Sequence, residues 1–135
     1  KYSKIKEYID STVEKAKKDG FVTTLYNRVR PIPELSSSNF MLRSFGERVA
    51  MNAPIQGTAA DIMKIAMINI FNRLKEEKLE SKLLIQVHDE VLLEVKDSEI
   101  DRVKEIVSSE MANAASLSVE LESEVNVGDT WFDAH

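Results

Sequence analysis

Residues 83–95 read LLIQVHDEVLLEV, a stretch that is almost wholly apolar except at its middle. Apolar side chains alternate on each side of His88, Asp89 and Glu90, as expected for two strands that each bury one face. The stretch is therefore predicted to be a β-hairpin with a tight turn at these three residues. Aspartate is common in turns because its side chain bonds nearby backbone groups. This structural explanation accounts for Asp89 but less well for the ionisable residues beside it.

A functional interpretation of the same turn is a site for a divalent cation. Magnesium takes oxygen ligands in near-ideal geometry, and one or two carboxylates usually hold it together with substrate phosphates. Stiff strands fix a carboxylate such as Asp89 better than a mobile loop does. The turn alone offers too few ligands, so a partner carboxylate must come from elsewhere.

A long helical pattern precedes the hairpin. From Ile55 to Leu74 the apolar residues recur mainly at steps of three and four, which is typical of a helix with a wide buried face. Before it, the serines at 36–38 are candidate N-caps for a helix over roughly 38–52. Pro54 is expected to break or restart the helix.

The remaining patterns complete a mixed order of helices and strands. In chain order they are a helix over 2–19 that stops at Gly20, a strand-like run over 21–26, a helix that begins at Asp97 or Ser98, and a strand over 117–127 with a polar outer face. The segment 21–35 is expected to form either a short hairpin or a strand followed by an extended loop, with Arg28 and Arg30 displayed on it. The sequence therefore predicts an α+β fold. Its small antiparallel sheet, made of hairpin 83–95 and strand 117–127, packs on helices.

Composition narrows the class of protein. The chain has 135 residues, a net charge of −5, two histidines and no cysteine, which excludes disulfides, thiolate nucleophiles and cysteine-type zinc sites. Residues 1–50 hold ten basic and six acidic residues, whereas residues 51–135 hold eight and seventeen. No apolar run is long enough to span a membrane, and no secretory signal opens the chain. Because it starts at Lys1 in a helical pattern, we expect an excised fragment or a processed chain.

Three polar residues with helical spacing form a second candidate site. Arg48, Asn52 and Gln56 follow one another at intervals of four, so a continuous helix would place them in one file. A solvated helix face is the structural alternative, but such faces are built mostly of Lys and Glu. Amide and guanidinium donors suit the minor groove, where A·T and G·C pairs share acceptors at purine N3 and pyrimidine O2. Such contacts check the shape of a base pair and not its sequence.

These two motifs together resemble a known family. RSFGERVAMNAPIQGTAADIMKIAM (residues 43–67), followed by LLIQVHDEVLLEV, is similar to the C-terminal part of family A DNA polymerases, bacterial DNA polymerase I in particular. The resemblance extends from KEYIDSTVEKAKKDGFVTTLYNR near the start to VNVGDTWFDAH at the end. It implies that residues 1–50 are the end of the fingers-to-palm connection and residues 51–135 are half of the palm.

The resemblance assigns catalytic roles to the hairpin turn. His88-Asp89-Glu90 matches the palm motif that holds the catalytic metals, so Asp89 would be one of two metal-binding aspartates. Glu90 lies beside it as a second candidate metal ligand, and His88 would lie near the primer 3′ end and its phosphate. These three are the candidate catalytic residues, and Mg²⁺ is the expected cofactor. The implied chemistry is two-metal nucleotidyl transfer.

The resemblance also assigns contacts with primer–template DNA. Arg48, Asn52 and Gln56 match the family's contacts to the minor groove and the primer–template, and Arg43 and Arg30 match basic positions near the duplex. The family commonly has a glycine and three arginines where this chain has NRVR at 27–30, a departure that removes one basic group but leaves the chemistry unaffected.

The resemblance further implies what this chain lacks. The second metal aspartate and the fingers helix that grips the deoxynucleoside triphosphate would both precede Lys1. The expected protein is therefore a cytoplasmic DNA-directed DNA polymerase, of which the 135-residue chain alone is inactive. Apolar surface left uncovered by the missing half could make the fragment self-associate.

Two other classes of protein are alternatives to a DNA polymerase. A non-catalytic nucleic-acid-binding domain with an exposed sheet would need aromatic residues on its strands for base stacking, and 83–95 and 117–127 have none. A purely structural α+β domain would show no affinity for primed DNA and no effect of Mg²⁺ through Asp89.

Overall fold

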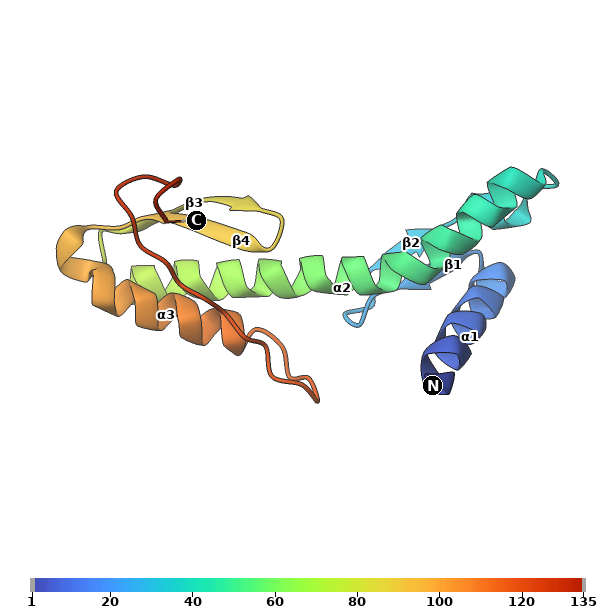
Figure 1. The fold of residues 1–135 in the computed structure, drawn as a ribbon, viewed down its shortest axis with the longest axis horizontal. Coiled ribbons are helices and arrows are strands. Elements are labelled where there is room, and N and C mark those ends of the chain that lie inside the picture. Colours follow the sequence, from blue (N-terminus) through green and yellow to red (C-terminus); the bar gives the residue numbers. More distant parts are fainter. Residues whose placement is uncertain (1, 135) are drawn as a thin grey trace. The chain divides into compact units, whose positions relative to one another are not determined.

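The computed structural model describes residues 2–134, and within them it has three α-helices and two separate two-stranded antiparallel sheets (Figure 1). This is the predicted α+β class. The elements in chain order are α1 (Ser3–Asp19), β1 (Phe21–Thr23), β2 (Val29–Pro31), the 3₁₀ turn η1 (Pro33–Ser36), α2 (Phe40–Glu76), β3 (Lys82–Val87), β4 (Glu90–Glu94), the 3₁₀ turn η2 (Asp97–Glu99) and α3 (Ile100–Ala112). Residues up to Asp61 form one compact unit and residues from Ile62 form another.

The amino-terminal unit begins with the predicted helix and hairpin. Helix α1 ends at Gly20, whose φ of 79° is the left-handed conformation that glycine adopts without strain, and its N–H bonds the Ala16 carbonyl. Strand β1 pairs with β2, with Val22 opposite Arg30, so the hairpin alternative is correct. Asn27 has a φ of 61° in the intervening turn, as a turn residue should. The buried core of this unit is made of Ala16, Val22, Ile32, Leu35 and Ala50.

Helix α2 differs from its prediction at both its start and its middle. Its N-cap is Asn39, whose Oδ1 accepts a hydrogen bond of 2.9 Å from the Met41 amide, and not one of the preceding serines. The helix also runs through Pro54 without a break. An internal proline removes one backbone hydrogen bond and costs about 3 kcal/mol in an isolated helix. The helix persists because the preceding turn is anchored, with Ala50 buried in the core and Ala53 packed against it.

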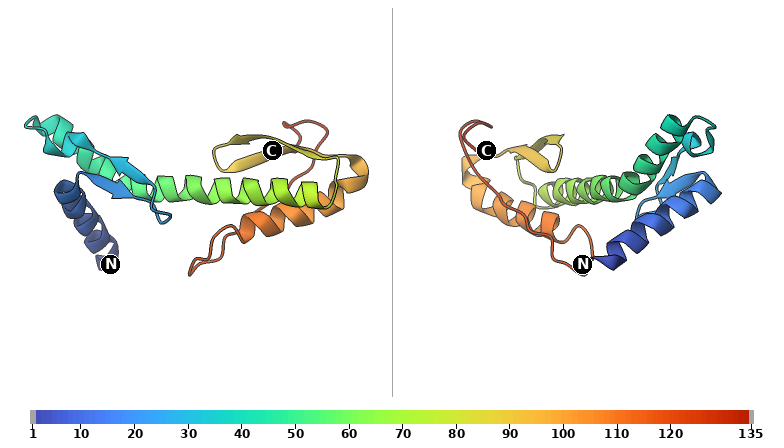
Figure 2. Two further views of the ribbon diagram at one scale, coloured as in Figure 1. Left: turned by 180° about the vertical axis from the view of Figure 1, so that it is seen from behind. Right: turned by 45° about the vertical axis from the view of Figure 1, so that its right-hand side comes forward.

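In the carboxyl-terminal unit the β3–β4 hairpin and α3 pack on the second half of α2. Figure 2 shows α3 beside this part of α2 from two further directions. The buried core is made of Ile70, Leu74, Val103, Ile106 and Val107, and one face of the hairpin rests on it through Leu83, Val91 and Leu93. The hairpin register shifts between Leu83 and Ile85, which marks a bulge. Leu84 and Ile85 are 54% and 48% exposed, so apolar surface remains uncovered on the hairpin.

The predicted strand over 117–127 is wrong, because the structure has no strand there. Residues 121–125 do alternate between half-buried and exposed side chains, as the sequence pattern requires. Their half-buried side faces α3, where Ser123 Oγ donates to the Ser108 carbonyl at 3.3 Å and Val125 packs against the core. Alternation therefore indicates an extended chain with one packed face, but not a backbone ladder to a partner strand.

None of the helices within residues 2–134 combines the length and the apolar character needed to cross a lipid bilayer.

Candidate functional site

The hairpin turn presents its three ionisable residues to solvent. Val87 pairs with Glu90, so the turn itself has only two residues, His88 and Asp89, and Glu90 opens β4. His88 has a φ of 53°, which two-residue turns demand and which Gly or Asn would adopt with less strain. All three side chains are exposed. A short turn between paired strands therefore holds Asp89 and Glu90 next to one another at a defined point.

Gln86 supports this turn from within β3. Its Nε2 donates a hydrogen bond of 2.8 Å to the His88 carbonyl, which fixes the backbone at the residue with positive φ. We did not predict this role from the sequence. The available signal was a neutral amide in the middle of an otherwise apolar strand.

The residues at the turn form an incomplete metal-ligand set. Within residues 2–134 there is no group of three or more His, Cys, Asp or Glu side chains placed to hold a metal ion. Over the same residues, no side chain pairs with the Asp89 carboxylate. The turn can thus supply one or two carboxylates to a cation whose other ligands come from a substrate or from other protein groups, which is the coordination that magnesium commonly has.

The polar file is formed as the spacing predicts. Because α2 is continuous, Arg48, Asn52 and Gln56 lie along one side of it, and all three side chains are exposed. The Arg48 guanidinium lies 6.0 Å from the centre of the Phe45 ring and donates to Ser44 Oγ at 3.3 Å. The file lies in the amino-terminal unit, whereas the hairpin turn lies in the carboxyl-terminal unit.

The two other candidate DNA contacts differ in their surroundings. Arg30 is exposed on β2. Arg43 is half-buried, donates from Nη1 to the Ser37 carbonyl at 3.0 Å and lies 5.9 Å from the centre of the Phe40 ring. Arg43 is therefore partly engaged in holding the start of α2, whereas Arg30 is displayed to solvent.

An ion pair that the sequence did not predict joins the first hairpin to α2, between an Arg28 side chain that is 60% exposed and a buried Asp61. Asp61 is 4% exposed and receives a hydrogen bond of 2.6 Å from Arg28 Nε and one of 2.7 Å from Thr24 Oγ1. The Arg28 guanidinium is thus held by a hydrogen bond to α2, although its side chain remains largely exposed. The signal was a single acid within an apolar helical stripe.

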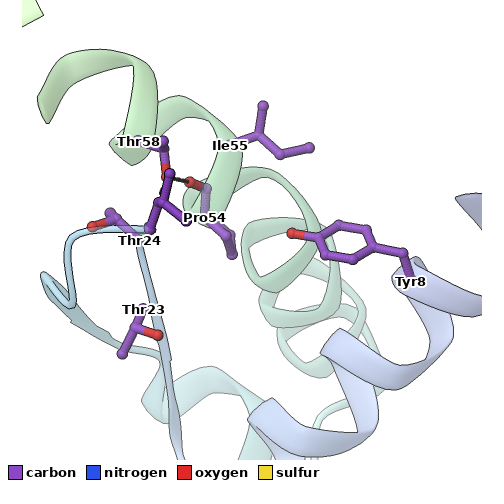
Figure 3. Close-up of a pocket in the computed structure, with 7 residues that line it drawn as sticks. Tyr8, Thr23, Thr24, Pro54, Ile55 and Thr58 are labelled. Carbon is purple, nitrogen blue, oxygen red and sulfur yellow. Dashed lines mark hydrogen bonds between the residues drawn. The ribbon is translucent and has the colours of Figure 1, made fainter. Parts of the chain in front are cut away.

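The same region has a shallow pocket of about 420 Å³. Figure 3 shows it between α1, the β1–β2 hairpin and α2, with the Thr58 hydroxyl bonded to the Pro54 carbonyl at 2.6 Å. Its lining is mostly apolar and contains none of the candidate site residues: Tyr8, Thr23, Thr24, Leu25, Pro54, Ile55 and Thr58. It is therefore separate from the candidate chemistry.

The exposed carboxylates of the hairpin turn, the exposed file of donors and the α+β frame are the features expected from the resemblance to family A DNA polymerases. The family model for DNA polymerase family A matches residues 1–133. The chain belongs to this family.

Individual relatives agree with this assignment. The chain is 53% identical to the DNA polymerase I of Caldicellulosiruptor bescii over 133 residues, which are 98% of this chain and 16% of that protein. It is 50% identical to the DNA polymerase I of Geobacillus stearothermophilus over 130 residues, or 96% of this chain and 15% of the relative. The chain thus spans about a sixth of these relatives.

A solved structure has the same fold. The POL domain of Pol1 from M. smegmatis, in complex with a DNA primer-template and dNTP, superposes with a TM-score of 0.92 and 46% identity. The match covers 96% of this chain and 23% of that one. Both units of the chain therefore have the fold of a portion of a DNA polymerase I polymerase domain.

Proposed function

We propose that this chain is part of a bacterial DNA polymerase I that transfers nucleotides from deoxynucleoside triphosphates to a primer 3′-hydroxyl under template direction. The family match over residues 1–133 supports the proposal, as does a relative solved with primer-template and dNTP. In this proposal residues 1–50 are the end of the fingers-to-palm connection and residues 51–135 are part of the palm. A cytoplasmic location belongs to the same proposal.

The observation that carries the proposal is the state of Asp89. Its side chain is exposed, it is presented by a two-residue turn, and among residues 2–134 no side chain neutralises it. If the turn only reversed the chain, Asn-Gly would form it with less strain than His88-Asp89, in which His88 has a positive φ. Backbone strain of this kind clusters at functional sites. We infer that the side chains of the turn have a role beyond reversing the chain.

The residues at the turn fit magnesium. Asp89 and Glu90 would supply carboxylate oxygens, and the phosphates of the nucleotide and the other aspartate of the polymerase would supply the rest. When bound, the metal lowers the pKa of the primer hydroxyl and neutralises charge on the triphosphate. The acidic character of residues 51–135 is then compatible with DNA binding, because the carboxylates bind DNA and nucleotide through the cation.

The remaining residues of the turn act by position. His88 would contact the primer 3′ end or its phosphate, as an exposed donor next to the metal-binding aspartate. Gln86 keeps the His88 carbonyl, and with it the turn, in one conformation. Phosphoryl transfer depends almost entirely on positioning and on stabilisation of charge. The turn, held in place by Gln86, provides the positioning.

The polar file would contact the duplex. Arg48, Asn52 and Gln56 carry donors that can reach the acceptors common to all base pairs in the minor groove. Arg30 and Arg43 would contact backbone phosphates, which fix the register of the duplex but carry no sequence information. The Arg43 contact is limited by its bond to the Ser37 carbonyl.

Substitution of Asp89 tests the metal assignment. In the full-length polymerase, Asp89→Ala should abolish primer extension and leave the affinity for primer-template mostly intact, because the carboxylate binds the metal and not the duplex. Asp97→Ala is the matched control, since Asp97 is also an exposed acid in the same unit. Primer extension by Asp89→Ala at the wild-type rate would refute the role of Asp89.

Substitution of Gln56 tests the minor-groove role. Gln56→Ala should change the extension of mismatched primers relative to matched ones, because one donor to the shared acceptors is lost. Asn72→Ala is a suitable control, since Asn72 is an exposed amide on the same helix. Identical mismatch extension by Gln56→Ala and wild type would contradict the role.

The isolated chain provides a third test. One metal-binding aspartate cannot assemble a two-metal site, so the purified 135-residue chain should not extend a primer. Extension by this chain, free of contaminating polymerase, would overturn the proposed division of the active site.

A further inference from the structure

Asp61 is a buried carboxylate to which the proposed chemistry gives no role. Its side chain is 5% exposed, yet both of its oxygens are engaged, Oδ1 by Arg28 Nε and Oδ2 by Thr24 Oγ1. The Arg28 side chain is 60% exposed, and ion pairs that are open to solvent on one side contribute little to stability. Stability alone is thus a weak reason for an acid at this position, and the geometry that it imposes is a better one.

Thr24 and Thr58 extend this ion pair into a network between the first hairpin and α2. The Thr24 hydroxyl, besides donating to Asp61, accepts hydrogen bonds of 3.2 Å from the amides of Tyr26 and Arg28. Thr58 Oγ1 accepts a hydrogen bond of 2.9 Å from the Leu25 amide. The turn between β1 and β2 is thereby bonded to α2 at two successive helical turns.

The hairpin also approaches α2 closely between these two bonds. A Cβ at Gly57 would lie 2.6 Å from Thr24 Cγ2, so only glycine permits this approach. Asp61 lies on the same side of the helix as Gly57 and Thr58, because it follows them by four and three residues. Gln56, the last residue of the polar file, directly precedes Gly57. The network therefore fixes the part of α2 that presents Gln56 to solvent.

We propose that Asp61 is a positioning residue. Through its hydrogen bonds with Thr24 and Arg28, it holds the β1–β2 hairpin at a fixed distance from α2. In this way Arg30 on the hairpin and Gln56 on the helix hold a primer–template duplex at fixed spacing. The inference rests on the proposed function, since it assumes that these two residues contact DNA. Asp61 itself touches neither the duplex nor the reacting atoms.

The expected effect concerns discrimination between matched and mismatched primer ends. Displacements of about 1 Å at a reacting complex can cost up to about a hundredfold in rate. Asp61→Asn and Thr24→Val each break part of the network while nearly preserving side-chain volume. Either change should reduce the preference for matched over mismatched ends by about tenfold. Extension of matched ends should change much less.

The experiment compares these variants in the full-length polymerase by single-turnover extension of matched and mismatched primers. Thr24→Ser keeps the hydroxyl and should retain discrimination, which makes it the conservative partner of Thr24→Val. Ile106→Val lowers stability in the other unit's core without touching the network and controls for loss of stability. Gln56→Ala reports on the proposed function itself.

The outcomes distinguish the positioning role of Asp61 from the proposed minor-groove role of Gln56. Reduced discrimination by Thr24→Val and Asp61→Asn, but not by Thr24→Ser or the core variant, supports the inference. Unchanged discrimination by both network variants, with an effect of Gln56→Ala, overturns the inference alone. An equal effect of the core variant also overturns it, because general destabilisation would then explain the result. If Gln56→Ala has no effect, the minor-groove role fails and the inference fails with it.

Discussion

Gly57→Ala offers a test of the packing between the first hairpin and α2. A Cβ at this position would lie 2.6 Å from Thr24 Cγ2, whereas carbon atoms in contact normally lie about 3.5–4.0 Å apart. Relief therefore requires a displacement of about 1 Å. Thr24 cannot simply rotate away, because its hydroxyl donates to Asp61 and accepts from two backbone amides.

Two opposing effects determine how much Gly57→Ala changes the free energy of unfolding. Replacing Gly by Ala within a helix usually stabilises by about 1 kcal/mol, because glycine loses more backbone entropy on folding. Forcing an extra carbon into a packed contact costs about 1–3 kcal/mol. We therefore expect Gly57→Ala to lower the free energy of unfolding by up to about 2 kcal/mol.

Removal of Thr24 Cγ2 should reverse the sign of the effect that Gly57→Ala has on the free energy of unfolding. Thr24→Ser keeps the hydroxyl, and the next atom near the new Cβ is then Thr24 Cβ, at 4.0 Å. In that background Gly57→Ala should stabilise by about 1 kcal/mol, the ordinary helical gain. Urea unfolding gives the free energies, and hydrogen exchange of the Leu25 amide reports the local opening, since this amide donates to Thr58 Oγ1. Destabilisation of equal size in both backgrounds would refute the proposed contact.

Three further predictions concern the carboxyl-terminal unit. Ile106→Ala should lower the free energy of unfolding by about 2–5 kcal/mol in urea titrations, because this side chain is fully buried in the core. Hydrogen bonds from Arg102 and then Arg73 lower the pKa of Glu77 to about 2. Because this pKa is lower in the folded state than in the unfolded state, the ionised Glu77 carboxylate stabilises the fold fully above about pH 4.5, and this stability is lost as the pH falls towards 2. Glu77→Gln should therefore weaken the dependence of the urea midpoint on pH between these two values. His88→Gly should relieve the positive φ and raise the thermal midpoint while slowing primer extension, and a loss of stability would argue against strain at the turn.

The periodic parts of the fold could be predicted from the sequence. Helix α1, the stop at Gly20, the β3–β4 hairpin and the buried stripe of α2 all follow from spacing, because each depends on neighbours within a few residues. The turn residues and the polar file were identified from their residue types and spacing, whereas Arg30, Arg43 and the catalytic roles came from the family resemblance. Their exposure at the turn and along α2 agrees with these roles, which the fold alone does not test.

The two incorrect predictions, a helix break at Pro54 and a strand over 117–127, share a physical cause. Pro54 was expected to interrupt α2, but core packing of Ala50 and Ala53 outweighs the lost hydrogen bond. Residues 117–127 alternate as a strand does, yet alternation only requires one packed side, and α3 provides it without a ladder. In both cases a local pattern was overridden by contacts with residues distant in sequence.

Asp61 shows how far such distant contacts can be inferred without a structure. An acid in an apolar helical stripe is rarely buried unless it is paired, so its position predicts a basic partner from another element. Arg28 and Arg30 were both available in the segment that precedes α2. Only the hairpin geometry separates them, because Arg30 is fixed in β2 opposite Val22 while Arg28 follows the turn and reaches Asp61. The same geometry engages the Arg28 guanidinium with Asp61 and leaves Arg30 exposed on β2.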